Sequence, residues 1–514
     1  MKRTFVLSIT LVAMIMASFS QSSNEGNSLD ELNRGKEPRN VIFILSDDHR
    51  WDFMGFTGKV PWLKTPAMDR LAEEGVFCRN TYVTTSLCSP SRASILTGLY
   101  SHTHQVVDNQ APVPENLIYF PQYIQEAGYK TAFFGKWHMG NQSDHPRPGF
   151  DHWESFRGQG TYYAPNLNIN GERTKYSNET YVTDLLTEHA IDWMDQREEG
   201  EPFFLYLSHK AVHAGFTPAR RHVGMYENEK YIFPASYQMT TKEKVGPLKQ
   251  KNLHEPDYDY GEGKLPDWVK EQRFSWHGVD YSYHRAEFDV ESLVKIYCEA
   301  LMAVDESISS IMEYLEKEGL LESTMIIYMG DNGFSFGEHG LIDKRQFYEE
   351  SAKVPLLVSC PQLFEGQQVE ERLIQNIDIA PTVLESFGID KPEHMHGASF
   401  LPILQGEEVE WRDRIFYEYY CEHQYPQTPT IHGVRTDQYK LIRYYGVWDR
   451  NELYDMVNDP EEMNNLIDSK EHKKIVVQLT SEIYDWLEAT DGMQIPLKRV
   501  RQGRYGDYRN PGMY

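Results

Sequence analysis

Carboxylate, lysine and histidine side chains stand directly after four apolar runs of this chain. The runs cover residues 40–45, 130–134, 203–207 and 324–329, and their β-branched and aromatic residues predict buried strands. Ligands of open parallel sheets bind beyond the carboxyl ends of the strands, so we expect these side chains at one shared edge. They are Asp47, Asp48 and His49; Lys136 and His138; His209, Lys210 and His213; and Asp331 and Asn332.

The acidic members of this set predict a divalent cation site. Asp47, Asp48, Asp331 and Asn332 offer hard oxygen atoms, which suit Ca²⁺ or Mg²⁺ better than zinc. Two adjacent carboxylates also repel each other unless a cation or a proton lies between them. A structural reading of each residue alone is simple, because Asp and Asn cap helices and fill turns.

Basic side chains accompany the carboxylates. Positive charge comes from Arg92, Lys136 and Lys344, and imidazoles, which titrate near neutral pH, come from His138 and His213, with His209 as an alternative to His213. A dication, lysines and histidines around an activated nucleophile are typical of phosphate or sulfate ester hydrolysis.

Cys88 is the candidate nucleophile position. The segment Cys88-Ser89-Pro90-Ser91-Arg92 predicts a loop that runs into a helix, with Pro90 in the first turn. Free N–H groups and the helix dipole would then lower the pKa of the thiol and make it reactive. The alternative is a small buried hydrophobic residue. The chain has five cysteines, so at least one is unpaired if the protein is exported.

The N-terminus predicts export. Residues 1–20 have a basic start, a short apolar run and a small-residue end, which together indicate a cleaved signal peptide, with a retained anchor as the alternative. Residues 21–38 are a polar leader. No later run of 18 apolar residues predicts an integral membrane span. We therefore expect a periplasmic or secreted protein.

The charge of the chain restricts its partners. The formal net charge is −26, and it is −28 once Lys2 and Arg3 leave with the signal peptide. Nucleic acid is thus an unfavourable partner. Such a charge also repels anionic substrates at long range, so an anionic substrate requires basic residues gathered in a pocket.

The order of elements predicts an α/β fold. The four strands, a further strand at 354–359 and helices at 65–75, 181–196 and 290–318 indicate a large, mostly parallel sheet sandwiched by helices. We assign residues 39–405 to this catalytic domain. Residues 406–514 are assigned to a smaller α+β domain with antiparallel strands near 415–420, 431–435 and 439–444 and a helix at 473–488. The irregular stretch 218–289 is expected to recognise substrate, or else to be an ordered insertion.

The motifs, taken together and in order, resemble those of formylglycine-dependent (type I) sulfatases of the alkaline-phosphatase-like superfamily, in particular bacterial polysaccharide sulfatases. Cys88-x-Pro90-x-Arg92 with Thr97-Gly98 matches the maturation signature, and residues 135–140 match the second signature. The remaining matches are residues 331–333, 337–340, 343–344 and 348–351, followed by 452–455, 459–461 and 465–466.

This resemblance implies a role for each site residue. A separate maturation enzyme would oxidise Cys88 to formylglycine (3-oxoalanine), whose hydrate would be the nucleophile. The divalent ion, usually Ca²⁺, would be bound by Asp47, Asp48, residue 88, Asp331 and Asn332. Arg92 would hold the hydrate, Lys136 and Lys344 would bind the sulfate oxygens, His213 would protonate the leaving oxygen, and His138 would remove a proton from the hydrate.

Some assignments stay open at this stage. His209 is an alternative general acid, and the proline that often follows this region in relatives is replaced here by His213-Ala214-Gly215. His49, Asp52 and His339 are expected to support the site or the fold. The aromatic content of 218–289 fits a carbohydrate site, although it fits an interdomain core equally well.

Several questions of substrate also stay open. The segments 148–153 and 158–163 resemble those of sulfatases that act on polysaccharides, with ulvan-type algal polymers and N-acetylglucosamine 6-sulfate glycans as candidates. The alternatives are a phosphate or phosphonate monoester hydrolase of the same superfamily and a non-catalytic homologue that binds sulfated glycans. The sugar, its sulfated position, endo or exo action and the oligomeric state are not determined by the sequence.

Overall fold

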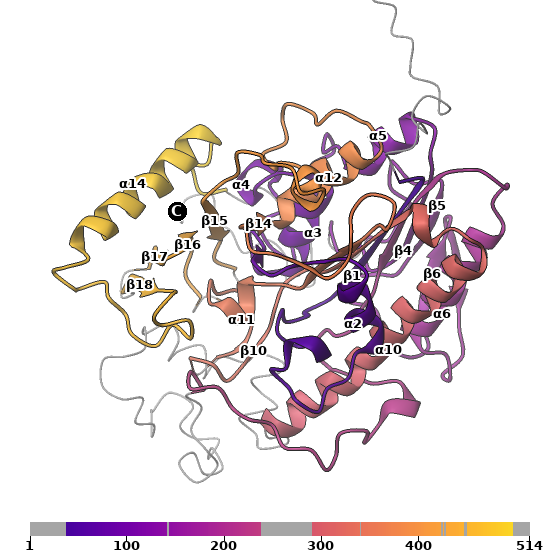
Figure 1. Ribbon diagram of the computed structural model, residues 1–514, viewed down its shortest axis with the longest axis horizontal. Coiled ribbons are helices and arrows are strands. Elements are labelled where there is room, and N and C mark those ends of the chain that lie inside the picture. The colour runs from indigo at the N-terminus through magenta and orange to yellow at the C-terminus, as the bar shows by residue number, and fades with distance from the viewer. Residues whose placement is uncertain are drawn as a thin grey trace, which may run out of the picture.

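The computed structural model describes residues 38–140, 143–237, 290–339, 341–422, 425, 428–446 and 450–496 (Figure 1). The predicted signal peptide, nearly all of the predicted leader and most of the stretch 218–289 lie outside the described residues.

A ten-stranded sheet forms the centre of the larger part of the chain. Its order is β13-β2-β12-β9-β1-β8-β4-β5-β6-β7. The bounds are β1 Asn40–Ser46, β2 Val76–Cys78, β4 Lys130–Gly135, β5 His152–Ser155, β6 Asn166–Ile169, β7 Glu172–Lys175, β8 Phe203–Ser208, β9 Thr324–Gly330, β12 Leu356–Ser359 and β13 Gln368–Glu370. All four strands that were predicted to carry site residues are present.

The register makes these four strands end side by side. β9, β1, β8 and β4 are neighbours and run parallel. Ser208 pairs with both Leu45 and Gly135, and Ser46 pairs with Gly330. The residues that follow each strand therefore start at the same edge of the sheet, as the sequence predicted.

The outer strands make the sheet mixed. The predicted strand at 354–359 is β12, and it runs antiparallel to both β9 and β2. β6 also runs antiparallel to its neighbours β5 and β7. The parallel centre with antiparallel outer strands confirms the expected large, mostly parallel sheet.

Helices cover both faces of this sheet (Figure 1). α2 (Pro66–Glu73), α6 (Val182–Asp195) and α10 (Val290–Lys317) pack on one face, and α3 (Cys88–Thr97), α5 (Phe120–Glu126) and α12 (Ile379–Ser386) pack on the other. Ile42 and Ile44 of β1 enter the first core, whereas Val41 and Phe43 enter the second. This alternation is the two-residue period of a strand that is buried on both sides.

Short elements connect these layers. They are η1 Gly55–Thr57, β3 Thr81–Tyr82, α4 Ser101–His104, η2 Arg220–His222, η3 Leu321–Ser323, β10 Ser335–Phe336, β11 Ile342–Asp343, α11 Glu349–Ala352, β14 Ile374–Gln375, η4 Asn376–Asp378 and α13 Leu401–Leu404.

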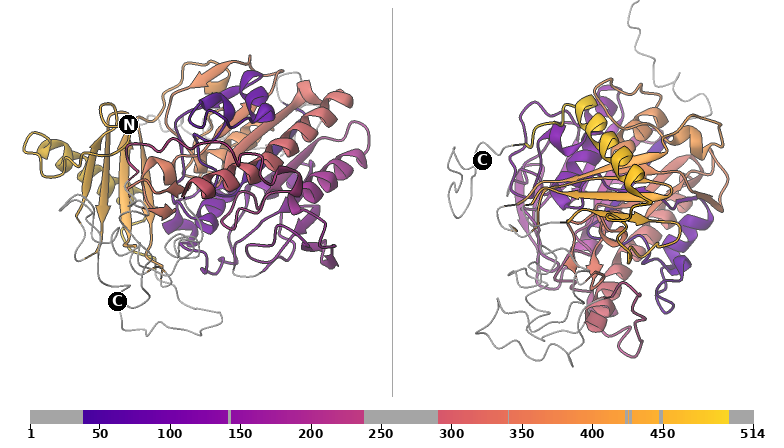
Figure 2. Two further views of the ribbon diagram at one scale, coloured as in Figure 1. Left: turned by 90° about the horizontal axis from the view of Figure 1, so that it is seen from below. Right: turned by 90° about the vertical axis from the view of Figure 1, so that its left-hand side faces the viewer.

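A separate antiparallel sheet lies at one end of the molecule (Figure 2). Its order is β15 (Arg414–Tyr419), β16 (Ile431–Thr436), β17 (Tyr439–Tyr444) and β18 (Glu452–Asp455). The first three strands and the helix α14 (Lys473–Ala489) were predicted from the sequence, whereas β18 was noted only as a motif. The exact boundary at residues 405 and 406 stays a prediction.

α14 packs on this sheet through one face. Leu479, Ile483 and Trp486 are buried against residues of the four strands, and Trp486 stacks on Phe416 with ring centroids 4.9 Å apart. Apolar residues at helical spacing explain why a sequence with this period forms a helix that covers the sheet. No helix among the described residues is long and apolar enough to cross a membrane.

Candidate active site

Carboxylates from two neighbouring strands meet at the parallel edge of the sheet. Asp47, Asp48 and Asp331 are fully buried, and their ligand oxygens lie within 4.8 Å of one another. The Asp48 N–H donates to Asp331 Oδ1 at 3.0 Å, and Asn332 Nδ2 donates to Asp48 Oδ1 at 2.7 Å. Four of the five residues predicted to bind the metal are therefore brought together, and the fifth is Cys88.

These residues fit a divalent ion. Asp48 Oδ2 and Asn332 Oδ1 are buried and accept no hydrogen bond from any described residue. Buried oxygen atoms of this kind are costly without a partner. Three carboxylates and an amide oxygen form the hard donor set that Ca²⁺ and Mg²⁺ prefer.

The pKa values of the carboxylates differ because their neighbours differ. Burial and the nearby Asp47 raise the pKa of Asp331 to about 7, against the opposing effect of Arg92. Burial also raises the pKa of Asp48. Burial alone would raise the pKa of Asp47 too, but Lys136 and other nearby cations hold it well below its usual range. The site thus concentrates negative charge that a cation stabilises.

Cys88 is the first residue of α3, as the sequence predicted, and its side chain lies beside the carboxylates. Its Sγ is 3.5 Å from Asp47 Oδ1 and 3.9 Å from Asp48 Oδ1, and Lys344 Nζ donates to it at 3.2 Å. The Cys88 side chain thus lies between the metal-site carboxylates and the Lys344 ammonium.

The prediction that the thiol itself has a lowered pKa was wrong. Burial raises the pKa of Cys88, although Lys136 and Lys344 oppose this effect. The helix N-terminus alone does not compensate for the loss of water around a fully buried sulfur. The other cysteines in the described part of the chain are also unpaired, so nothing in that part indicates a disulfide framework.

Lys136 and Lys344 both contact carboxylates of the metal site, although they belong to different parts of the chain. The Lys136 ammonium contacts Asp47, and the Lys344 ammonium contacts both Asp48 and Cys88. Both lysines are almost fully buried. Two buried ammonium groups in the site provide the positive charge that an anionic ester requires.

Arg92 contacts a metal-site carboxylate instead of Cys88. Its Nε donates to Asp331 Oδ2 at 2.8 Å, and its Nη1 donates to the Lys136 carbonyl and to Ser208 Oγ, each at 2.7 Å. One buried guanidinium thereby connects α3 with the ends of β4, β8 and β9. In this structure Arg92 fixes the strand ends relative to residue 88.

Of the two candidate general acids, His213 is the one whose ring lies beside Asp47 and Cys88. A ring nitrogen of His213, Asp47 and Cys88 place their ligand atoms within 4.8 Å of one another. His209 Nε2 instead contacts Ser307 Oγ of α10 at 3.0 Å. Burial lowers the pKa of His213 well below its usual value, and Lys136 adds to this effect. A bound anionic sulfate would oppose it.

His138 is joined through its backbone to Ser89 of α3. Its side chain is buried, Nδ1 has no hydrogen-bond partner among the described residues, and its carbonyl accepts a hydrogen bond from Ser89. Burial lowers the pKa of His138 well below its usual value, again with a contribution from Lys136. A neutral imidazole with a free nitrogen is suited to accept a proton.

Three further candidates support the fold. His49 lies between Tyr328 Oη at 2.6 Å and the Phe53 carbonyl at 3.0 Å. Asp52 pairs with Arg50, and His339 stacks on Tyr348 with centroids 3.9 Å apart. No contact of these three with Cys88 or with the metal-site carboxylates appears among the described residues.

Sequence analysis gave no role to three charged residues next to the site. Lys210 stands in the turn that carries His213, and Asp343 and Arg345 flank Lys344. Arg345 Nε donates to Glu422 Oε1 at 2.7 Å, and its guanidinium also pairs with Asp343 and stacks on Tyr425. Their position directly beside predicted site residues was the available signal.

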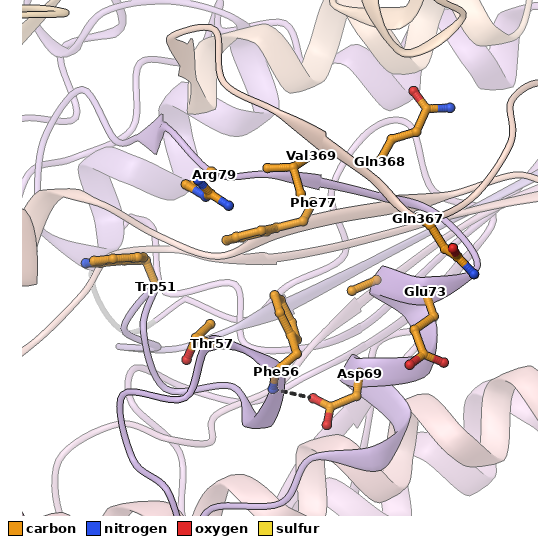
Figure 3. Close-up of a pocket in the computed structure, with 11 residues that line it drawn as sticks. Trp51, Phe56, Thr57, Asp69, Glu73, Phe77, Arg79, Gln367, Gln368 and Val369 are labelled. Atoms are coloured by element: carbon orange, nitrogen blue, oxygen red, sulfur yellow. Dashed lines mark hydrogen bonds between the residues drawn. The ribbon is translucent and has the colours of Figure 1, made fainter.

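A surface groove lies apart from these residues. It has a volume of about 470 Å³ and runs along the edge strand β13 (Figure 3). Trp51, Phe56, Phe77 and Val369 make most of its wall apolar. None of the predicted site residues lines this groove, and its apolar wall does not suit a sulfated ligand.

Comparison with known families accounts for this arrangement. The sulfatase family model matches residues 39–389, and a model for the C-terminal part of N-sulphoglucosamine sulphohydrolases matches residues 337–489. The chain belongs to the sulfatase family, within the alkaline-phosphatase-like superfamily, and is a sulfatase. The resemblance predicted from the motifs is thereby confirmed.

Individual relatives agree with this assignment. The N-acetylglucosamine-6-O-sulfatase of Bacteroides thetaiotaomicron is 32% identical over 510 residues, which cover 91% of this chain and 88% of that protein. Human N-acetylglucosamine-6-sulfatase is 31% identical over 420 residues, which cover 77% of this chain and 70% of that protein. A solved structure, described as a complex with its substrate D-glucosamine-2-N,6-O-disulfate, has a TM-score of 0.76 and 31% identity and covers 90% of this chain and 100% of that one.

Proposed function

We propose that this sulfatase removes the 6-O-sulfate from glucosamine units of a sulfated carbohydrate. The observation that carries the proposal is the contact of Cys88 with both Asp47 and Lys344, which joins a nucleophile position, a cation site and a sulfate-binding ammonium. The names of the relatives above support glucosamine 6-sulfate over an ulvan-type polymer.

The nucleophile in this proposal is a formylglycine hydrate made from Cys88 by a separate maturation enzyme. The hydrate supplies one hydroxyl that attacks sulfur and a second hydroxyl whose loss of a proton expels the sulfate. The raised pKa of the thiol supports this reading, because an unmodified Cys88 would be a poor nucleophile at neutral pH. Intact-mass analysis of protein from its native host tests it. Conversion lowers the mass of the peptide that contains residue 88, and an unchanged mass would contradict the mechanism.

The chain's own groups then act on the substrate. Lys136 and Lys344 bind the sulfate oxygens, His213 donates a proton to the departing sugar oxygen, and His138 accepts a proton from the hydrate. In support, Lys344 and His213 lie beside Cys88, Lys136 contacts Asp47, and His138 has a buried Nδ1 without a partner among the described residues. Electrostatic stabilisation by such preorganised groups usually accounts for a large part of a rate enhancement.

The resident ion is proposed to be Ca²⁺, bound by Asp47, Asp48, Asp331, Asn332 and residue 88. It would lower the pKa of a hydroxyl bound to it and so favour a nucleophile at neutral pH. We expect a chelator to abolish sulfate release and Ca²⁺ to restore it. Ion binding should also raise the melting temperature, since a ligand at a hundred times its Kd adds about 2.7 kcal/mol of stability. A melting temperature insensitive to both treatments would contradict the site.

Export of the protein stays part of the proposal. The residues that predict a signal peptide, 1–20, would place the enzyme in the periplasm or outside the cell. N-terminal sequencing of mature protein from the native host tests this, and a mature chain that still begins at Met1 would contradict it.

A panel of defined sulfated sugars tests the activity. We expect sulfate release from N-acetylglucosamine 6-sulfate or glucosamine 2-N,6-O-disulfate, with loss at position 6. Activity on aryl sulfates alone would contradict a carbohydrate substrate. Faster phosphate than sulfate release from matched esters would favour the monoester hydrolase alternative. Sugar binding without turnover by fully matured protein would favour the non-catalytic alternative.

A further inference from the structure

Lys210 has a buried ammonium with no counter-ion in the described part of the chain. The residue is only 5% exposed. Its Nζ lies 4.7 Å from the centre of the Tyr162 ring, and no hydrogen bond or ion pair from this side chain to a described residue occurs. A cation–π contact replaces only part of the hydration that a buried ammonium loses. The group therefore lacks an anionic partner.

The backbone places this ammonium beside the general acid. The His213 N–H donates to the Lys210 carbonyl at 3.0 Å, so both residues belong to one tight turn after β8. Tyr162, on which the ammonium rests, donates its Oη to the His213 carbonyl at 2.7 Å. Lys210, Tyr162 and His213 thus form one connected unit.

The position differs from that of the two sulfate-binding lysines. Lys136 and Lys344 are each paired with a carboxylate of the metal site, and Lys344 also contacts Cys88. Lys210 makes none of these contacts. Its backbone lies in the turn that carries His213, the proposed proton donor to the departing sugar oxygen, and Asp47, Asp48 and Cys88 act on its ammonium without pairing with it.

We propose that Lys210 and Tyr162 form a subsite for a second anionic substituent of the substrate. This inference rests on the proposed function, because it assumes that a sugar is the leaving group. The substituent is a sulfo group on the same sugar or a carboxylate of the neighbouring one, and both offer the same anionic oxygens. Tyr162 holds the Lys210 ammonium in place through its ring.

The pKa of Lys210 is consistent with an anion-binding role. Burial lowers the pKa of Lys210 to about 8, and Lys136 contributes to the shift. A bound anion would reverse both effects. In a chain whose formal net charge is −26, an ammonium without a paired carboxylate is also a means to attract a polyanionic glycan locally.

The test compares singly and doubly charged substrates in Lys210→Met. We expect KM for glucosamine 2-N,6-O-disulfate to rise roughly tenfold or more, as loss of one charge-assisted hydrogen bond predicts. For N-acetylglucosamine 6-sulfate, KM and kcat should stay within about twofold of the wild-type values. Lys210→Arg should restore much of the loss. Lys317→Met, at an exposed lysine of α10, is the matched control. A disaccharide that joins a uronic acid to N-acetylglucosamine 6-sulfate distinguishes the carboxylate from the N-sulfo group.

Two results would overturn the subsite. An equal loss on both sugars would mean that Lys210 acts on the reacting sulfate. No change on either sugar, or on the uronic acid disaccharide, would mean that it binds no substrate anion. Calorimetric binding of the disulfated sugar to Cys88→Ala, with and without Lys210→Met, keeps the test independent of turnover. If the wild type releases no sulfate from any sugar but this binding difference persists, then the proposed function fails and the subsite stands.

Discussion

The two lysines of the active site are positioned in different ways. Lys136 directly follows β4, its N–H donates to the Ser208 carbonyl at 2.8 Å, and its own carbonyl accepts from Arg92. Lys344 follows β11, a two-residue strand that pairs only with β10. One lysine is fixed by the central sheet, and the other stands on a connection outside that sheet.

The C-terminal sheet stabilises the segment that carries Lys344. Phe347 stacks on Tyr417 of β15 with centroids 4.4 Å apart, and it lies so close to Gly433 that a Cβ at residue 433 would be 2.4 Å from its ring. Lys440 of β17 donates to the Phe347 carbonyl and pairs with Glu349 and Glu462. The smaller sheet is therefore part of the construction of the active site, because it positions the segment that carries Lys344.

We describe the site as two halves: the strand-end half, which contains Asp47, Lys136 and Asp331, and the Lys344 half. Loss of Cys88 should lower activity most, since Asp47 of the first half and Lys344 of the second both contact it. We expect Cys88→Ala to lower kcat roughly 10⁴-fold or more, as the loss of other enzymes' nucleophiles does. Turnover of a sulfated sugar by the variant, compared with matured wild-type protein, is the measurement, with circular dichroism to show that the fold is retained. Turnover at the wild-type rate would show that residue 88 is not the nucleophile.

Loss of Lys136 or of Lys344 should lower kcat by similar amounts, and by less than loss of Cys88 does. Lys136→Met and Lys344→Met each remove one cation from the sulfate, so kcat should fall about 10²- to 10³-fold in both. The two variants should be compared at saturating Ca²⁺, so that cation binding is not limiting. A normal rate in one of them would show that only the other half of the site binds sulfate.

Lys440→Met should disturb the Lys344 half of the site and leave the strand-end half unchanged. Removal of this buried ammonium takes the paired cation from Glu462, whereas Glu349 keeps Arg435 and Lys353, and we expect the loss to cost about 3–5 kcal/mol of stability. The melting temperature and kcat should fall, while Ca²⁺ affinity measured by calorimetry stays near the wild-type value, because the strand ends are intact. Lys473→Met, at an exposed position of α14, is the control. An equal loss of Ca²⁺ affinity would show that the C-terminal sheet supports both halves.

The smallest effect concerns a contact between α4 and β15. His102 Nδ1 lies 2.7 Å from Glu418 Oε2, and this carboxylate raises the pKa of His102 above its usual value although burial opposes it. The pair therefore stabilises the protein fully below the unfolded pKa of 6.5 and loses this contribution as the pH rises through the folded pKa.

His102→Gln should accordingly lower the free energy of unfolding by about 1–3 kcal/mol near pH 6 and by less near pH 9. Urea denaturation at both pH values measures the difference. His145→Gln, at an exposed histidine, should show no such dependence. A difference independent of pH would mean that the pair does not titrate as described.

Much of the strand-end half could be predicted from the sequence. Each apolar run is short and β-rich, and each is followed at once by its polar group, so a parallel sheet fixes where Asp47, Lys136 and Asp331 lie. The motif around Cys88 also predicted the start of α3. Only the pKa of its thiol was wrong, because burial is a tertiary property that local helix geometry does not reveal.

The sequence by itself determined the family, the parallel centre of the sheet and the residue types of the site. The tertiary structure decided three things that depend on contacts between distant segments. It placed His213 rather than His209 at the centre, it connected Arg92 to Asp331, and it positioned Lys344 through the C-terminal sheet. These depend on side-chain direction and on packing between elements, which spacing along the chain does not encode.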